Sequence, residues 1–74
     1  MVQHELLVTD YVEDGSSLYI QVEIRDGETE LSFRGEVRFL EELLYGDLIH
    51  PTRSPLSDSC RTYSIGTLRK HFGR

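Results

Sequence analysis

A run of strictly alternating residues from 18 to 25 constrains the fold of this chain more than any other feature. Its apolar side chains fall on one side and the others on the opposite side: Leu18, Ile20, Val22 and Ile24 against Tyr19, Gln21, Glu23 and Arg25. Such alternation is typical of a strand with one buried and one solvated face. The pair Asp26-Gly27 then favours a tight hairpin turn, and Leu31 and Phe33 resume the alternation. The stretch predicts two antiparallel strands.

A further strand is expected before this hairpin, over residues 3–12. The two sets of side chains on its faces are His4, Leu6 and Val8 against Glu5, Leu7, Thr9 and Tyr11. Each set contains an aliphatic residue, so the pattern does not say which face is buried. Residues 13–16 have the composition of a turn, and the three strands together make an antiparallel meander.

Residues 36–45 have the period of an amphipathic helix. Val37, Leu40 and Leu44 lie at positions i, i+3 and i+7, with Phe39 and Leu43 beside them. Glycine 46 is a natural stop. Burial of these five side chains, at about 1.5–3 kcal/mol each, would dock the helix on the sheet, and a charge at Leu40 would then unfold the domain.

The last third of the chain has weaker patterns. Residues 47–59 are expected to be irregular, residues 60–64 are a candidate fourth strand, and residues 65–72 have the spacing of a short C-terminal helix. The predicted fold class is therefore α+β. It is a single domain over residues 1–74: a small antiparallel β-meander of three or four strands, one amphipathic helix packed on one face, and the short C-terminal helix.

Size and cysteine content indicate a cytoplasmic protein whose fold is stabilised further by a partner. A chain of 74 residues buries only about 60% of the surface that its unfolded form exposes, so its core is thin. Cys60 is the only cysteine, which excludes an intrachain disulfide and favours a reducing compartment. The first residues lack the features of a signal peptide, and no apolar run is long enough to span a membrane.

Charge is distributed unevenly along the chain. The net charge is −5, yet residues 1–47 carry 12 of the 13 acidic residues and only three arginines. Residues 48–74 carry five basic residues and Asp58 as their one acid. Such asymmetry can steer a charged partner toward one part of the surface.

No motif in the sequence indicates catalysis, a metal or another cofactor. The candidate metal ligands lack the short local spacings of a structural zinc site; they are His4, His50, Cys60 and His71. The acidic run at residues 10–15 does not fit an EF-hand loop. Two sets could supply a nucleophile and a base, but neither lies in a recognisable context: Cys60 with His71, and Ser57 with His50 and Asp58. We therefore expect a protein that is not an enzyme.

The first functional hypothesis is a protein-interaction module. It would be a small acidic inhibitor or regulator of a basic, nucleic-acid-handling protein, in the style of phage counter-defence proteins, antitoxins and immunity proteins. The candidate contacts lie on the solvated face of the sheet and in its second turn: Tyr19, Glu23, Arg25, Glu28 and Glu30. An exposed tyrosine among charged residues suits a recognition surface.

Two alternatives stay open from the sequence. One is a nucleic-acid-associated regulator that contacts phosphates through the C-terminal basic residues Arg61, Arg69, Lys70 and Arg74. The other is a structural homo-oligomer, most simply a homodimer, because a meander leaves edge strands that need pairing or protection.

Overall fold

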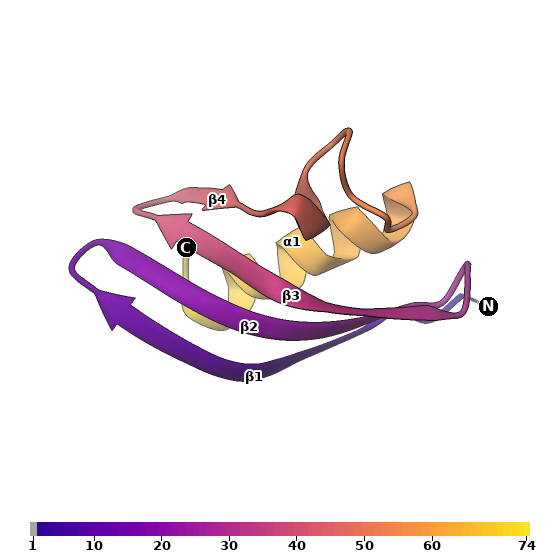
Figure 1. The fold of residues 1–74 in the computed structure, drawn as a ribbon, viewed down its shortest axis with the longest axis horizontal. Coiled ribbons are helices and arrows are strands. Elements are labelled where there is room, and N and C mark those ends of the chain that lie inside the picture. Colours follow the sequence, from indigo (N-terminus) through magenta and orange to yellow (C-terminus); the bar gives the residue numbers. More distant parts are fainter. Residues whose placement is uncertain (1) are drawn as a thin grey trace.

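Four antiparallel strands and one long helix make up the fold, which is known from a computed structural model that describes residues 2–74 (Figure 1). The elements are β1 (Glu5–Asp14), β2 (Ser17–Asp26), β3 (Leu31–Leu40), β4 (Leu43–Tyr45), the 3-10 helix η1 (Asp47–Ile49) and α1 (Asp58–Phe72). The sheet order β1-β2-β3-β4 is that of a meander. The predicted α+β class is confirmed.

The middle strand β2 forms as its alternation predicts. Its apolar set is buried, with exposed fractions of 2% or less. The turn after it differs from the prediction, because residues 27–30 form a longer loop in which the Glu30 N–H donates to the Asp26 carbonyl at 2.8 Å. Gly27 is needed there for a close approach: a Cβ on it would lie 2.2 Å from the Gln3 carbonyl oxygen.

The helix predicted over residues 36–45 is wrong. These residues form the end of β3, a turn at Glu41 and Glu42, and β4. Val37 and Phe39 are 1% and 0% exposed because they pair with β2 over the core, whereas Leu40 remains 42% exposed. The apolar pattern of this segment fits a strand as well as a helix, and pairing with β2 stabilises the strand.

The helix of this fold is α1, which replaces both the strand predicted over 60–64 and the shorter helix predicted over 65–72. Its N-cap is Ser57, whose Oγ accepts from the Cys60 N–H at 3.3 Å, and its C-cap is Gly73 in the left-handed conformation. The fully buried positions are Cys60, Ser64 and Leu68, one turn apart. Two of these three are small or polar, so the buried stripe is weak in sequence.

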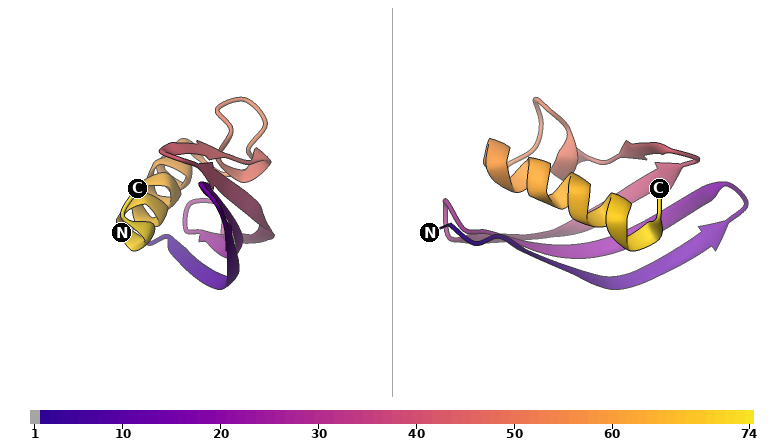
Figure 2. Two further views of the ribbon diagram at one scale, coloured as in Figure 1. Left: turned by 90° about the vertical axis from the view of Figure 1, so that its left-hand side faces the viewer. Right: turned by 180° about the vertical axis from the view of Figure 1, so that it is seen from behind.

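The core lies between one face of the sheet and α1, and the helix runs along that face (Figure 2). Strands β2 and β3 supply most of it, and η1, the following loop and α1 close it. The buried apolar residues are Leu18, Ile20, Val22, Ile24, Val37, Phe39, Leu48, Ile49, Leu56, Cys60 and Leu68. Within residues 2–74, no helix is both long enough and apolar enough to cross a bilayer.

A bulge in β1 decides which of its side chains face the core. The register shifts between Val8 and Asp10, so Thr9 is an extra residue in the strand. After the shift Tyr11 lies on the same face as Leu6 and Val8, and its ring packs edge-on against Phe72 at 5.5 Å. The sequence pattern had placed Tyr11 on the opposite face, because a simple alternation carries no bulge.

Candidate functional site

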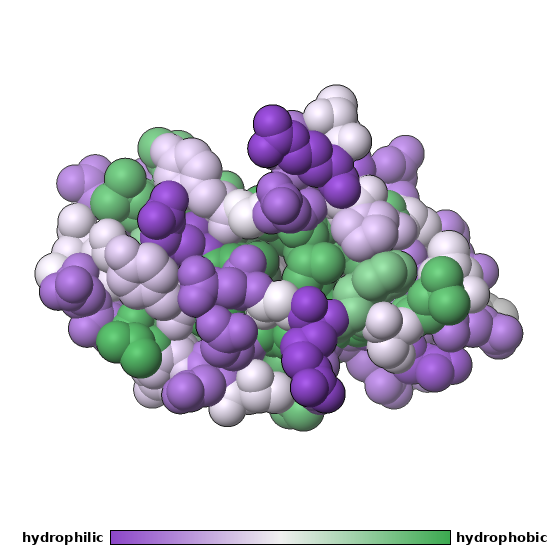
Figure 3. Space-filling model, in the orientation of Figure 1, coloured by the Kyte–Doolittle hydropathy of each residue, from purple (hydrophilic) through white to green (hydrophobic). Residues whose placement is uncertain are grey.

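The face of the sheet turned away from α1 is open to solvent, and we call it the open face (Figure 3). It carries a mixture of charged, polar and apolar side chains. It is built from residues of β1 to β4 that pair across the strands with their side chains directed away from the core. The candidate residues Tyr19, Glu23 and Arg25 belong to this face.

One row of paired residues at the end of the open face carries a stacked arginine. The row runs Val12, Tyr19, Arg38, Tyr45 across the four strands. The Arg38 guanidinium carbon lies 5.8 Å from the centroid of the Tyr19 ring and 5.9 Å from that of Tyr45. We call Tyr19, Arg38 and Tyr45 the tyrosine row. The exposed side chains of Leu40 and Leu43 lie beside it, so this end of the face is largely apolar and aromatic.

The other end of the open face is hollowed and charged. A depression of about 650 Å³ lies there. Its lining comes from three neighbouring strands: Glu5, Leu6, Leu7, Glu23, Ile24, Arg25, Ser32, Phe33 and Arg34. Glu23 Oε1 and Arg34 Nη2 form an exposed ion pair at 2.7 Å. The hollow brings together Glu23 and Arg25, two of the residues predicted from sequence.

Glu28 and Glu30 lie next to this hollow, exposed in the loop between β2 and β3. Tyr19 lies far from them, because it is six positions before Arg25 in an extended strand, a distance of roughly 20 Å. The five predicted residues are therefore spread along the face and its adjoining loop. Sequence reasoning missed Arg38 and Tyr45, since the false helix over 36–45 hid their alternation on β3 and β4.

Acidic charge gathers on β1 rather than on the whole open face. The face itself also carries Arg25, Arg34 and Arg38, which offset its acids. Strand β1 has no basic residue and four acidic ones: Glu5, Asp10, Glu13 and Asp14. Glu13 and Asp14 lie beside the turn to β2, whereas Glu28 and Glu30 lie in the loop at the opposite end of the sheet.

Most of the C-terminal basic residues are engaged within the molecule. Arg69 Nη1 donates to the carbonyl oxygens of Glu42 and Arg74 at 3.0 and 2.9 Å. Arg74 Nη1 donates to those of Ser16 and Glu41, each at 3.1 Å. Both guanidinium groups also lie over the Phe39 ring. They tie the end of the chain to two hairpin turns.

The other two residues of that set differ from each other. Arg61 Nη1 lies 3.1 Å from Asp58 Oδ1 and 3.3 Å from the Pro51 carbonyl oxygen. Lys70 is exposed near the end of α1. Lys70 is therefore exposed to solvent, whereas the three arginines are held by contacts within the chain.

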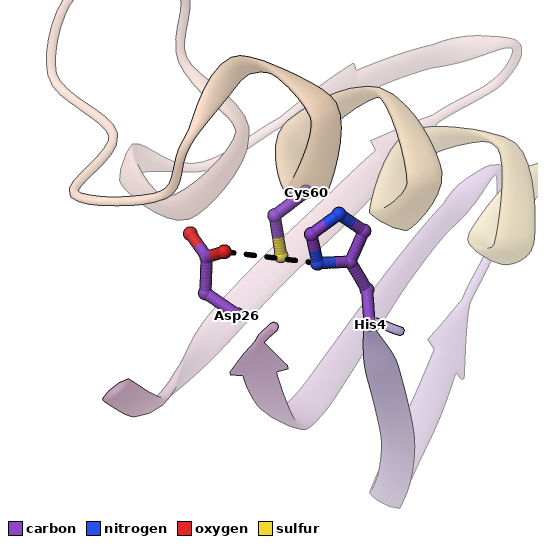
Figure 4. A group of neighbouring side chains, drawn as sticks. All are labelled: His4, Asp26 and Cys60. Atoms are coloured by element: carbon purple, nitrogen blue, oxygen red, sulfur yellow. Dashed lines mark ion pairs between the residues drawn. The ribbon is translucent and has the colours of Figure 1, made fainter. Parts of the chain in front are cut away.

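A second cluster joins three polar residues that are far apart in sequence. His4 precedes β1, Asp26 ends β2 and Cys60 lies in the first turn of α1, and their side chains point toward one another (Figure 4). Their potential ligand atoms all lie within 4.8 Å of one another. Asp26 and Cys60 are 0% exposed. Sequence reasoning named His4 and Cys60 among the candidate metal ligands but missed Asp26 and the convergence of the three, because no local spacing relates them.

Hydrogen bonds hold the Asp26 carboxylate in its ionised form. Oδ2 accepts from the Ser57 N–H at 2.6 Å, and Oδ1 accepts from the Ser57 hydroxyl at 2.9 Å and the Glu28 N–H at 3.0 Å. Burial by itself raises the pKa of Asp26, but these donors and the Thr29 N–H outweigh it and lower the pKa below its ordinary value. Asp26 thus ties the N-cap of α1 to the loop after β2.

The two ring nitrogens of His4 are also engaged. Nδ1 accepts from the Gly27 N–H at 3.0 Å, and Nε2 lies 3.0 Å from the Ser59 hydroxyl oxygen. Because Nδ1 accepts, the hydrogen-bond network assigns the proton of the neutral ring to Nε2, which donates to Ser59. Nδ1 lies 3.6 Å from Asp26 Oδ1, a contact that becomes an ion pair only when the ring is protonated.

The chemistry of this cluster favours a structural role. Burial raises the pKa of the Cys60 thiol, and the nearby Asp26 charge raises it further, so the sulfur stays protonated and inert. Imidazole, carboxylate and thiolate are zinc ligands in principle. Here, however, the one lone pair of His4 Nδ1 is used by Gly27, and an ion held by all three residues would break that bond. We call His4, Asp26, Ser57 and Cys60 the polar clasp.

The nucleophile sets considered from sequence do not assemble. Cys60 and His71 lie on the same helix, eleven residues or roughly 16 Å apart. The Ser57 hydroxyl donates to Asp26, while His50 Nδ1 accepts from the N–H groups of Thr52 and Arg53.

No family model matches the sequence, and no curated protein or solved structure is detectably similar to it.

Proposed function

We propose that this chain is a non-enzymatic protein-interaction module of the cytoplasm, an inhibitor or regulator that binds a basic, nucleic-acid-handling protein. The observation that carries the proposal is the tyrosine row, where Arg38 lies between Tyr19 and Tyr45 on a sheet face that nothing covers among residues 2–74. Tyrosine and arginine are enriched among the residues that dominate binding energy at protein interfaces.

The charge distribution supports a basic partner. Strand β1 carries four acids and no base, and within residues 2–74 Glu23 is the one acid of the open face that forms an ion pair with an arginine. Complementary charge accelerates association and rejects partners of like charge. Carboxylates presented in this way can take the place of phosphates on a nucleic-acid-binding surface.

A catalytic role has little support in the described residues. The one thiol, Cys60, is buried and protonated, and the hydroxyl of Ser57 donates into a carboxylate. The nucleic-acid alternative is weakened too, because three of its four candidate residues already bind carbonyl oxygens or a carboxylate within the chain. Phosphate binding would have to replace those contacts.

The test is affinity capture from a lysate of the native cells, with and without nuclease. One variant reverses three acids around the hollow: Glu23→Lys, Glu28→Lys and Glu30→Lys. The matched control reverses Glu41, Glu42 and Asp47 to lysine, which changes the net charge equally. It also matches local features, since Glu30 and Glu41 both have positive φ, and Glu23 and Asp47 both pair with an arginine.

The proposal predicts a stoichiometric protein partner that survives nuclease treatment. The first variant should bind this partner much more weakly than the control variant does. A partner that disappears with nuclease would overturn the proposal in favour of the nucleic-acid alternative. Equal loss in both variants would show that net charge, rather than this surface, governs binding.

A further inference from the structure

The outer edge of β1 borders a groove against α1. Among residues 2–74, β1 is hydrogen-bonded to β2 alone. A hollow of about 390 Å³ lies beside it, lined by residues 6–11 of β1 together with Thr67 and His71 of α1. An extended segment placed along this edge would therefore meet both strand backbone and helix side chains.

The direction of the backbone groups in β1 follows from its pairing with β2. The Asp26 carbonyl accepts from the Glu30 N–H on the side of β3, whereas the Gln21 carbonyl accepts from the Thr9 hydroxyl on the side of β1. Backbone groups alternate in direction along a strand. The odd-numbered residues of β2 therefore bond to β1, and its even-numbered residues bond to β3.

Residues of β1 that lie opposite even-numbered residues of β2 direct their N–H and C=O groups outward. Leu6 and Val8 are such residues, and so is Tyr11. The Tyr11 N–H is already held by the Asp10 carboxylate at 2.8 Å. The open donors and acceptors in the grooved part of the edge are thus those of Leu6 and Val8.

We propose that this edge binds an extended basic segment of the partner protein as an added strand. This inference rests on the proposed function, because it takes the partner to be a basic protein. In the added strand, apolar side chains would enter the groove beside Leu6, Val8 and Thr67. Lysine or arginine side chains would alternate with them on the open face, near Glu5 and Asp10. Main-chain bonds supply affinity in this mode of recognition, and alternate side chains supply specificity.

A second copy of the chain fits this edge less well. Symmetric pairing of two β1 strands with Leu7 opposite Val12 would place Glu5 opposite Asp14, and each strand brings four acids and no base. Like charges opposite each other destabilise a strand pair. Charge therefore selects a basic segment over self-association.

The test is an NMR titration of ¹⁵N-labelled protein with the peptide Lys-Val-Lys-Val-Lys-Val-Lys. Saturable shifts are expected at the amides of Leu6 and Val8 and at Thr67. The peptide in which glutamate replaces every lysine should leave the spectrum unchanged. No shift up to millimolar peptide, or shifts confined to other parts of the molecule, would overturn the inference.

Two variants separate the backbone contact from side-chain packing. Val8→Pro removes the outward N–H and is tolerated on an edge strand, whereas Val8→Ala keeps that N–H. We expect Val8→Pro to bind the peptide about tenfold more weakly than Val8→Ala does, as for one lost hydrogen bond, because both variants lose the valine side chain and only the proline also loses the N–H. Equal binding by both variants would contradict the added strand.

Failure of this inference and failure of the proposed function give different results. If the captured partner shifts Tyr19, Arg38 and Tyr45 while the amides of Leu6 and Val8 stay unchanged, the open face binds and the added strand is wrong. If no protein partner is captured at all, the proposed function fails. Dimerisation through β1, seen by analytical ultracentrifugation and abolished by Val8→Pro, would overturn the choice of occupant.

Discussion

Replacement of Asp26 by asparagine should remove a large share of the folding stability. The carboxylate is 0% exposed and receives three hydrogen bonds, two of them from Ser57. An asparagine amide cannot accept at both ends, so one amide NH₂ would face a donor. Loss of a hydrogen bond to a charged group costs about 1.5–3 kcal/mol, and a buried donor left unsatisfied costs about 1–3 kcal/mol.

We therefore expect Asp26→Asn to lower the free energy of unfolding by about 3 kcal/mol. A domain of 74 residues has about 4–11 kcal/mol in total. Urea denaturation followed by far-ultraviolet circular dichroism at neutral pH measures the loss. Asp47→Asn is the matched control, because Asp47 is exposed and its contact with Arg53 is 4.0 Å long, so it should cost less than about 1 kcal/mol.

The dependence on pH gives this prediction a second readout. The pKa of Asp26 is lowered in the folded state from its ordinary value of 3.8. Its stabilisation is therefore complete above pH 3.8 and is lost as the pH falls through the lower, folded-state pKa. The difference in stability between the original chain and Asp26→Asn should shrink over that acidic range. An equal cost for Asp26→Asn and Asp47→Asn at neutral pH would refute the reasoning.

Further outcomes can be measured by thermal or urea denaturation. Gly66→Ala should raise stability by about 0.5–1 kcal/mol, because it lies within α1 and a Cβ there meets nothing within 4 Å; lower stability would contradict this. Gly27→Ala should destabilise the fold through its clash with the Gln3 backbone, and an unchanged melting temperature would argue against that contact. Phe39→Ala should lower the free energy of unfolding by about 3–5 kcal/mol, while Leu40→Glu should lower it by less than about 1 kcal/mol. A chain unfolded by Leu40→Glu would instead support the helix predicted over 36–45. Added Zn²⁺ should leave the melting temperature unchanged, and a rise abolished by Cys60→Ser would show that the polar clasp binds metal.

The sheet could be predicted from the sequence where a strand has a clear alternation of its own. In β2, every even-numbered residue from Leu18 to Ile24 is apolar and buried, and a period of two has no other simple interpretation. The stretch 36–45 satisfied two periods at once. Only the partner strand distinguishes them, since Val37 and Phe39 are buried by pairing with β2, and a local pattern does not contain that information.

The helix and the site were harder to predict for related reasons. The fully buried positions of α1 include Cys60 and Ser64, which are small or polar, so hydrophobic periodicity barely marks the helix. Tyr19 was identified because it lies on β2, whereas Arg38 and Tyr45 reach the same row only through β3 and β4. The polar clasp depends on contacts between distant segments, and no local spacing signals it.

Hydrogen–deuterium exchange of the chain, alone and bound to its captured partner, tests the central claim most directly. The account predicts slower exchange in β1 and along the open face around Tyr19 and Arg38, with the buried turns of α1 unchanged. Protection confined to the C-terminal half of α1 around Lys70, or no protection in the sheet, would contradict it.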